Sequence, residues 1–173
     1  MVELVKKAKR GNRDAFSKLY QMYQKDIYRI AFVYVKNKDD ALDIVQETAY
    51  RSFKYIKKLK DPDKFKTWLL KIAVHSSLDL IQKGKNIVPM DHEYEPISYE
   101  KVNETIPLSL TLKALIELLN VEEKGVILLR FYQDFSIQQI ADTLDMPLGT
   151  AKTILYRGLR KLQKGWKEDE IHG

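Results

Sequence analysis

The sequence predicts an all-α protein made of two small helical domains joined by a flexible linker. Only 7 Gly and 5 Pro occur among the 173 residues, and these are the residues that interrupt helices most strongly. Apolar side chains recur at helical spacing on both sides of a central stretch that lacks this periodicity. A hydrophobic content of 45% suffices for a buried core, which argues against a disordered chain.

The composition also narrows the class of protein. Cys is absent, which excludes disulfides, thiolate metal sites and Cys nucleophiles and fits a reducing compartment. No apolar stretch approaches the roughly 18 residues of a membrane span, and the N-terminus has no apolar run long enough for a secretory signal. The net charge of +6 suggests a polyanionic partner, although its distribution matters more than its total.

The first domain is expected over residues 1–83 and is helical almost throughout. Apolar side chains follow a helical pattern over 15–34, and the polar residues 36–39 interrupt it. We expect a new helix over 40–56, with acidic residues in its first turn where the helix dipole favours them. Another helix is expected over 64–82.

Residues 84–106 are expected to form an acidic linker, because they contain two Pro, five acidic residues and only two Lys, without helical periodicity. Fully extended, such a segment spans at most roughly 75–80 Å. His92 has acidic neighbours at Asp91, Glu93 and Glu95. This charge run is interpreted as a solvated segment, and no metal site is expected.

The second domain is expected over residues 107–173. Asn120 with Glu123, and Ser136 with Gln139, have the spacing of capping boxes at helix starts. The expected helices are 108–119, 120–132, 136–144 and 150–166.

The last two of these helices carry apolar stripes joined by a tight turn. The stripes comprise Ile137, Ile140, Ala141 and Leu144 on the first helix and Ala151, Leu155, Gly158 and Leu162 on the second. Because small residues allow the helices to cross closely, this pattern predicts a helix-turn-helix.

The opposite face of the last helix carries Lys152, Thr153, Tyr156, Arg157 and Arg160. Lys and Arg can contact phosphates or guanine, and Thr and Tyr can contact thymine methyl groups or phosphates. The pattern therefore favours DNA binding over the alternative, a helical hairpin with a solvated basic face.

The helix over 40–56 carries an acidic and amide face. Asp40, Asp43 and Glu47 lie on it with Gln46, and an exposed apolar strip of Leu42, Val45 and Ala49 is expected beside it. Such a surface suits a protein partner that carries Arg and Lys. The alternative is an ordinary solvated helix start.

A basic, aromatic-rich segment follows between residues 53 and 71. Cations that follow phosphates and rings that stack on unpaired bases suit single-stranded DNA. Trp68 is interpreted as a core residue, whereas Lys66, Lys71, His75 and Asp79 are placed nearer the exposed face.

No catalytic site is expected. His75, His92 and His172 are far apart in the sequence, and no motif for a metalloprotease, a hydrolase nucleophile or a dinucleotide is present. The sequence therefore predicts neither intrinsic catalysis nor a cofactor.

With these residues in place, the chain resembles bacterial sigma factors of the extracytoplasmic-function (ECF) group, within the sigma-70 family. Residues 40–53 are similar to region 2.2 of that family, and residues 65–83 are similar to regions 2.3 and 2.4. The similarity to region 4 lies in Leu128-Leu129-Arg130-Phe131, Ser136, Ile140-Ala141, Leu144, Pro147, Gly149-Thr150, Lys152, Leu155 and Arg157.

The resemblance implies a sigma factor that binds core RNA polymerase, through the clamp helices of the largest subunit and the flap, and directs initiation at promoter DNA. It implies region 2 at 1–83, a linker at 84–106 and region 4 at 107–173. The implied polymerase contacts are Asp40, Asp43, Gln46 and Glu47. The implied −10 contacts are Lys60, Asp61, Lys64, Lys66, Lys71, His75 and Asp79. The implied −35 contacts are Arg130, Thr150, Lys152, Thr153, Tyr156, Arg157 and Arg160.

The resemblance further implies a monomer in the bacterial cytoplasm, not itself inserted in the membrane and controlled by an anti-sigma factor that is often membrane-anchored. Two departures stand out. Val74-His75 replaces a common Arg-Asn pair, and Ile154 and Leu159 replace residues that are often basic. The alternatives are a helix-turn-helix regulator outside the polymerase holoenzyme and a helical adaptor that binds only proteins.

Overall fold

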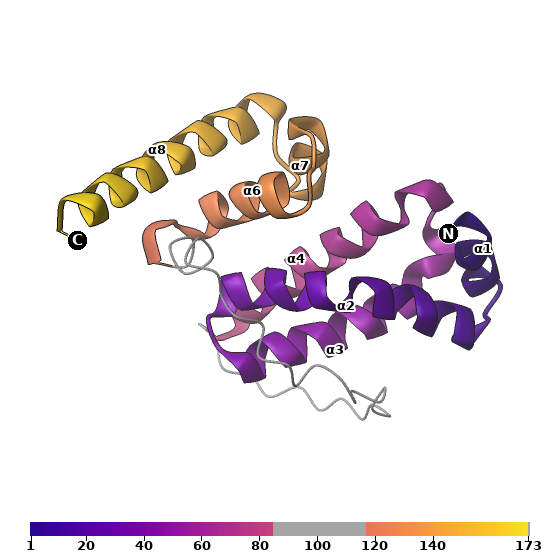
Figure 1. Ribbon diagram of the computed structural model, residues 1–173. Coiled ribbons are helices and arrows are strands. Elements are labelled where there is room, and N and C mark those ends of the chain that lie inside the picture. The colour runs from indigo at the N-terminus through magenta and orange to yellow at the C-terminus, as the bar shows by residue number, and fades with distance from the viewer. Residues whose placement is uncertain (85–116, 173) are drawn as a thin grey trace. The chain divides into compact units, whose positions relative to one another are not determined.

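The computed structural model describes residues 1–84 and 117–172 (Figure 1). The chain divides into two compact units, Met1–Pro107 and Leu108–Gly173. Every element in the described ranges is helical, which confirms the predicted all-α class with two small domains. The predicted linker, except Gly84, and most of the helix predicted over 108–119 lie outside the described residues.

In residues 1–84, the described part of the first unit, there are four α-helices and two short 3₁₀ turns. Its α-helices are α1 (Val2–Lys9), α2 (Arg13–Val35), α3 (Lys38–Tyr55) and α4 (Phe65–Gly84), and the turns are Ile56–Lys58 and Pro62–Lys64. The helices α2, α3 and α4 lie side by side and pack on one another, and α1 packs on α2 (Figure 1).

The predicted break at 36–39 is a direct corner between α2 and α3. Lys36 adopts a left-handed conformation with φ 62°, and its N–H donates to the carbonyl of Phe32, which ends α2. Asn37 then accepts a hydrogen bond from the Asp40 N–H at 2.8 Å. Because Asn37 is the N-cap, α3 begins at Lys38, two residues before the predicted start.

One prediction about α3 is wrong. Val45 and Ala49 do not form an exposed apolar strip, because they are 0% and 2% exposed and belong to the core of the first unit. The hydroxyl of Tyr20 also donates to the Val45 carbonyl at 2.5 Å. Leu42 is half-buried. The apolar face of α3 therefore packs inward against α2 and α4, and only its polar face is available to a partner.

The second unit contains α6 (Val121–Tyr132), α7 (Ile137–Thr143) and α8 (Leu148–His172). Both predicted capping boxes are present. Asn120 and Glu123 exchange backbone-to-side-chain bonds of 3.0 and 2.9 Å, and Ser136 and Gln139 exchange bonds of 2.8 and 3.1 Å. These boxes fix the starts of α6 and α7 where the sequence placed them.

The helices α7 and α8 form the predicted helix-turn-helix. Asp145, in the turn, has φ 52°. The carbonyl of Pro147 accepts from the Ala151 N–H at 3.0 Å, so α8 begins at Leu148 rather than at residue 150. It also continues beyond the predicted end at residue 166, because residues 167–172 contain neither Gly nor Pro.

A close crossing of α6 and α8 forms the centre of the second unit. Gly158 is buried, and a Cβ there would lie 3.1 Å from Cγ1 of Ile127. Ile154 is 4% exposed and packs within the unit. Its replacement of an often-basic family residue therefore adds to the core. Among residues 1–84 and 117–172, none of the helices has the length and apolar character needed to cross a membrane.

Candidate functional site

The polar face of α3 holds the four residues predicted to contact polymerase. Asp43 and Gln46 are exposed, and Asp40 and Glu47 are half-buried. Desolvation raises the pKa of Asp43 above its ordinary value, and the neighbouring Asp40 and Asp39 carboxylates raise it further. This face thus concentrates negative charge that a cationic partner would relieve.

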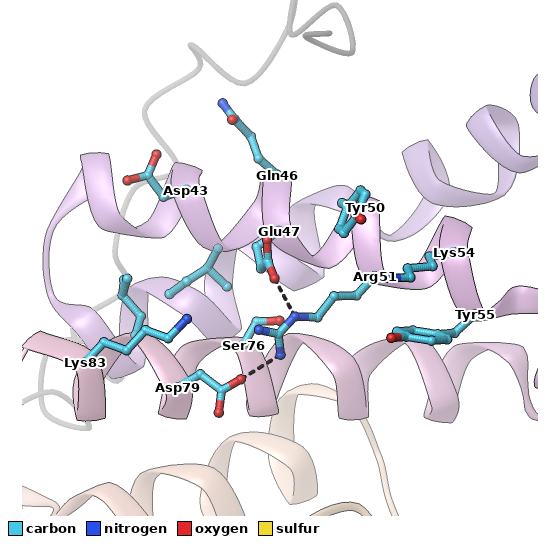
Figure 2. A pocket seen from close by; sticks show the side chains of 12 residues that line it. Asp43, Gln46, Glu47, Tyr50, Arg51, Lys54, Tyr55, Ser76, Asp79 and Lys83 are labelled. Atoms are coloured by element: carbon cyan, nitrogen blue, oxygen red, sulfur yellow. Dashed lines mark hydrogen bonds and ion pairs between the residues drawn. The ribbon is translucent and has the colours of Figure 1, made fainter. Parts of the chain in front are cut away.

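A groove of about 680 Å³ lies between α3 and α4 (Figure 2). It brings three residues of the predicted polymerase contact, Asp43, Gln46 and Glu47, together with Asp79, which the sequence placed on the −10 surface. The two predicted surfaces of the first unit therefore meet at one groove.

Arg51 joins the two sides of this groove. Its Nε donates to Glu47 Oε1 at 2.5 Å, and its Nη1 donates to Asp79 Oδ2 at 2.6 Å (Figure 2). Burial lowers the pKa of Arg51, but the hydrogen bonds to Asp79 and Glu47 outweigh burial and raise it overall. Sequence reasoning missed this residue. The four-residue spacing from Glu47 was a visible signal, but Asp79 is 28 residues away. We call the set Glu47–Arg51–Asp79 the Arg51 bridge.

The predicted −10 residues occupy two places. Lys60, Asp61 and Lys64 are exposed in the connection between α3 and α4, where Asp61 accepts from the Asp63 N–H at 3.0 Å. The others lie on α4 and are half-buried. Lys71, His75 and Asp79 follow each other at intervals of four residues and share one face. Lys66 lies about 140° around the helix from Lys71, at about 100° per residue, and does not share that face. The α4 residues concerned are Lys66, Lys71, His75 and Asp79.

The aromatic residues of this segment divide into two groups. Phe65 is 1% exposed, and its ring packs 5.9 Å from that of half-buried Trp68. In contrast, Tyr50 and Tyr55 are exposed, and Lys54 Nζ lies 5.7 and 5.4 Å from their ring centroids. The exposed rings beside cations are therefore at the end of α3, and Tyr50 was not among the residues that the sequence singled out.

The exposed face of α8 carries all six residues predicted to contact the −35 element from this helix. Tyr156 is 57% exposed, and the Thr153 hydroxyl donates to the Gly149 carbonyl at 3.0 Å. The seventh predicted residue, Arg130, is exposed on α6 and donates to the Phe135 carbonyl at 3.0 Å. The exposed residues of α8 are Thr150, Lys152, Thr153, Tyr156, Arg157 and Arg160.

Glu123 lies beneath this face, and its side chain is 0% exposed. Its carboxylate accepts from Arg157 Nε at 2.7 Å and from Lys161 Nζ at 2.8 Å, besides the capping bond from the Asn120 N–H. Burial raises the pKa of Glu123, but the bonds from Lys161, Asn120 and Arg157 outweigh burial and lower it overall. The sequence identified Glu123 only as a cap, because its partners on α8 lie 34 and 38 residues away.

Comparison with known proteins identifies the family. Residues 19–87 match Sigma-70 region 2, and residues 115–164 match Sigma-70, region 4. The RNA polymerase sigma factor SigV of Bacillus subtilis is 37% identical over 142 residues, which cover 82% of this chain and 84% of SigV. The chain belongs to the sigma-70 family of RNA polymerase sigma factors.

Other similarities agree with the ECF group of sigma factors. The ECF RNA polymerase sigma factor SigW of Bacillus subtilis is 29% identical over 174 residues, which cover 92% of this chain and 93% of SigW. The fold is also that of CnrH, solved in complex with the cytosolic domain of CnrY. That structure gives a TM-score of 0.71 at 20% identity and covers 97% of both chains.

This sigma factor therefore binds core RNA polymerase and directs promoter-specific initiation through the −10 and −35 elements. The alternative of a regulator outside the holoenzyme is not supported. Sigma factors are non-catalytic initiation factors. The match to region 2 lies in the first unit, and the match to region 4 lies in the second.

Proposed function

We propose that the acidic face of α3 is the contact with the polymerase clamp helices. Asp43 and Gln46, exposed at the mouth of the α3–α4 groove, are its centre. Asp40 and Glu47 flank it, partly engaged by Asn37 and Arg51. The observation that carries this proposal is the burial of Val45 and Ala49, because it leaves α3 with a polar contact surface that suits a cationic partner.

Promoter contacts are assigned to separate surfaces of the two units. In the first unit, Lys60, Asp61 and Lys64 hold the melted −10 strand, and Lys71, His75 and Asp79 face the duplex edge, with Lys66 at the start of α4. In the second unit, α8 enters the −35 major groove with Lys152, Thr153, Tyr156 and Arg157. The sugar–phosphate backbone of the flanking DNA is contacted by Thr150, Arg160 and Arg130.

The remaining parts of the proposal follow from this role. Region 2 extends over 1–83, the linker over 84–106 and region 4 over 107–173, with region 4 also touching the polymerase flap. The chain itself performs no catalysis and acts as a monomer in the cytoplasm, where polymerase and promoter DNA are found. An anti-sigma factor holds it inactive, as NepR is found in complex with the sigma factor RpoE of Bartonella quintana.

Reconstitution with core polymerase tests the clamp contact. Asp43→Arg combined with Gln46→Arg should weaken the affinity for core polymerase by roughly 10-fold or more, because cations would meet the Arg and Lys of the partner. Asp14→Arg, which reverses an exposed acidic residue on α2, is the matched control and should bind normally. Unchanged affinity of the double variant would show that polymerase binds elsewhere.

The −35 assignment has its own test. Lys152→Glu combined with Arg157→Glu should abolish transcription from a template that depends on its −35 element, while association with core polymerase persists. If that transcription continued at the normal level, α8 would not be the promoter-reading helix. Templates are taken from promoters mapped by transcript starts after overproduction of the chain.

A further inference from the structure

The two capping boxes of the second unit differ in one respect. At α7, the third helical position is Gln139, an exposed neutral side chain whose Oε1 accepts from the Ser136 N–H at 2.8 Å. At α6, the same position is Glu123, a fully buried carboxylate that accepts from the Asn120 N–H at 3.0 Å. A neutral amide therefore satisfies a capping box in this fold, and capping alone does not require the charge at Glu123.

Burying a carboxylate is unfavourable unless it is paired and hydrogen-bonded. Among the described residues, the partners of Glu123 beyond its own cap are both on α8, and they are Arg157 Nε at 2.7 Å and Lys161 Nζ at 2.8 Å. Each of these cations keeps a large exposed fraction, 46% for Arg157 and 43% for Lys161. The carboxylate thus holds the inner side of two side chains whose outer parts remain accessible.

The backbone geometry brings these groups within reach. Gly158, next to Arg157, lies against α6, and a Cβ at that position would lie 3.7 Å from Cβ of Glu123. Glu122, the neighbour of Glu123, is 66% exposed and lies 3.6 Å from Arg157 Nη2. The buried Glu123 therefore makes the short contact with Arg157 Nε, and the exposed Glu122 makes only the longer contact with Nη2.

We propose that Glu123 is a positioning residue for −35 recognition, which orients the Arg157 guanidinium by holding its Nε from below while the terminal nitrogens face the DNA. The inference rests on the proposed role of α8. Arg has many rotamers, and fixing them before binding removes part of the ordering cost on the promoter. Glu123 thereby increases discrimination between a correct −35 element and other DNA.

The test compares Glu123→Gln with Glu122→Gln in holoenzyme reconstituted from the full chain. Glu123→Gln keeps the volume and the capping acceptor, as Gln139 does, and leaves two cations that water can reach, so the unit should fold. Each variant removes one negative charge from the same turn, so any general gain in DNA affinity is matched. Transcription is measured on a template with an intact −35 element and on one with that element scrambled.

Glu123→Gln should reduce the ratio of activity on the intact template to activity on the scrambled template by about 3- to 10-fold, the range for ordering one long side chain on binding. Glu122→Gln should change the ratio by less than about 2-fold. In an Arg157→Gln background, Glu123→Gln should have no further effect, because the side chain that it positions is gone. A role limited to stability would instead add to the Arg157 effect.

Three results would overturn the proposal. A normal ratio for Glu123→Gln together with a reduced ratio for Arg157→Gln would reject the positioning role alone. Equal effects of Glu123→Gln and Glu122→Gln would reduce the finding to net charge. A normal ratio for Arg157→Gln would reject Arg157 as a promoter contact, and with it the assignment on which the inference rests.

Discussion

Removal of the Arg51 bridge should destabilise the first unit by about 1.5 kcal/mol. Arg51→Met keeps most of the apolar stem but loses both ion pairs. The bond to Glu47 joins side chains that are 26% and 31% exposed, and we assign it about 1 kcal/mol, between an exposed pair and a buried charged bond. Asp79 is 46% exposed, so its bond is discounted for solvent screening to about 0.5 kcal/mol.

The chain offers a selective assay for this change. Its 2 Trp are Trp68 in the first unit and Trp166 in the second. In a Trp166→Phe background, the fluorescence of half-buried Trp68 therefore reports on unfolding of the first unit. At about 4–8 °C for each kcal/mol in a domain of this size, Arg51→Met should lower its Tm by roughly 6–12 °C, and salt should reduce the difference.

Arg29→Met is the control for this prediction. Arg29 pairs with Asp26 at 3.7 Å along one helix, with a side chain that is 39% exposed, and such a pair contributes little. The control should therefore change Tm only slightly. If Arg51→Met were as mild as Arg29→Met, the bridge would not hold α3 to α4, and the reasoning from its geometry would be wrong.

Three further predictions concern single residues. Ser76 is buried with no hydrogen-bond partner for its hydroxyl among the described residues, whereas the hydroxyl of its neighbour Ser77 donates to Ala73 O at 2.8 Å. Ser76→Ala should therefore raise the free energy of unfolding, measured by urea unfolding, by about 1 kcal/mol, and Ser77→Ala should not raise it. Gly158→Val should destabilise the second unit by about 1–3 kcal/mol through overpacking against Ile127. Gly149→Ala, whose added Cβ would meet no atom within 4 Å, should be neutral or mildly stabilising in the same denaturation assay. The folded-state pKa of Glu123 lies below its ordinary value near 4.5, so its pairing with Arg157 and Lys161, beside Glu122, stabilises the second unit above pH 4.5. This stabilisation is lost as the pH falls through the lowered pKa. Glu123→Gln should remove this part of the acid dependence in urea unfolding at pH 7 and pH 4, and an unchanged dependence would contradict the prediction.

Local signals in the sequence were sufficient for the helix starts of the second unit. Asn120 with Glu123 and Ser136 with Gln139 satisfy their own backbone groups within one turn, so nothing distant is needed to locate them. The helix α3 begins two residues before its predicted start, because Asn37 caps it and both Asp39 and Asp40 already lie in its first turn. Local spacing thus predicts the elements better than their ends.

Pairing between distant segments was not accessible from the sequence. Val45 and Ala49 were expected at the surface because one helix cannot reveal that it has two neighbours, α2 and α4. The partners of Arg51 and Glu123 across helices depend on how those helices cross, which no spacing rule within one helix encodes. The candidate surfaces were therefore predicted as sets of exposed residues, whereas the ion pairs that order them were not.

The connection between α2 and α3 consists of only two residues, Lys36 and Asn37. Lys36 ends one helix and Asn37 caps the next, so the direction in which α3 leaves α2 depends on the backbone angles of two residues. One residue inserted just after Asp40 would turn Asp43, Gln46 and everything beyond by about 100° relative to the capped first turn. The direction in which the proposed polymerase contact faces is therefore set by the C-cap at Lys36 and the N-cap at Asn37.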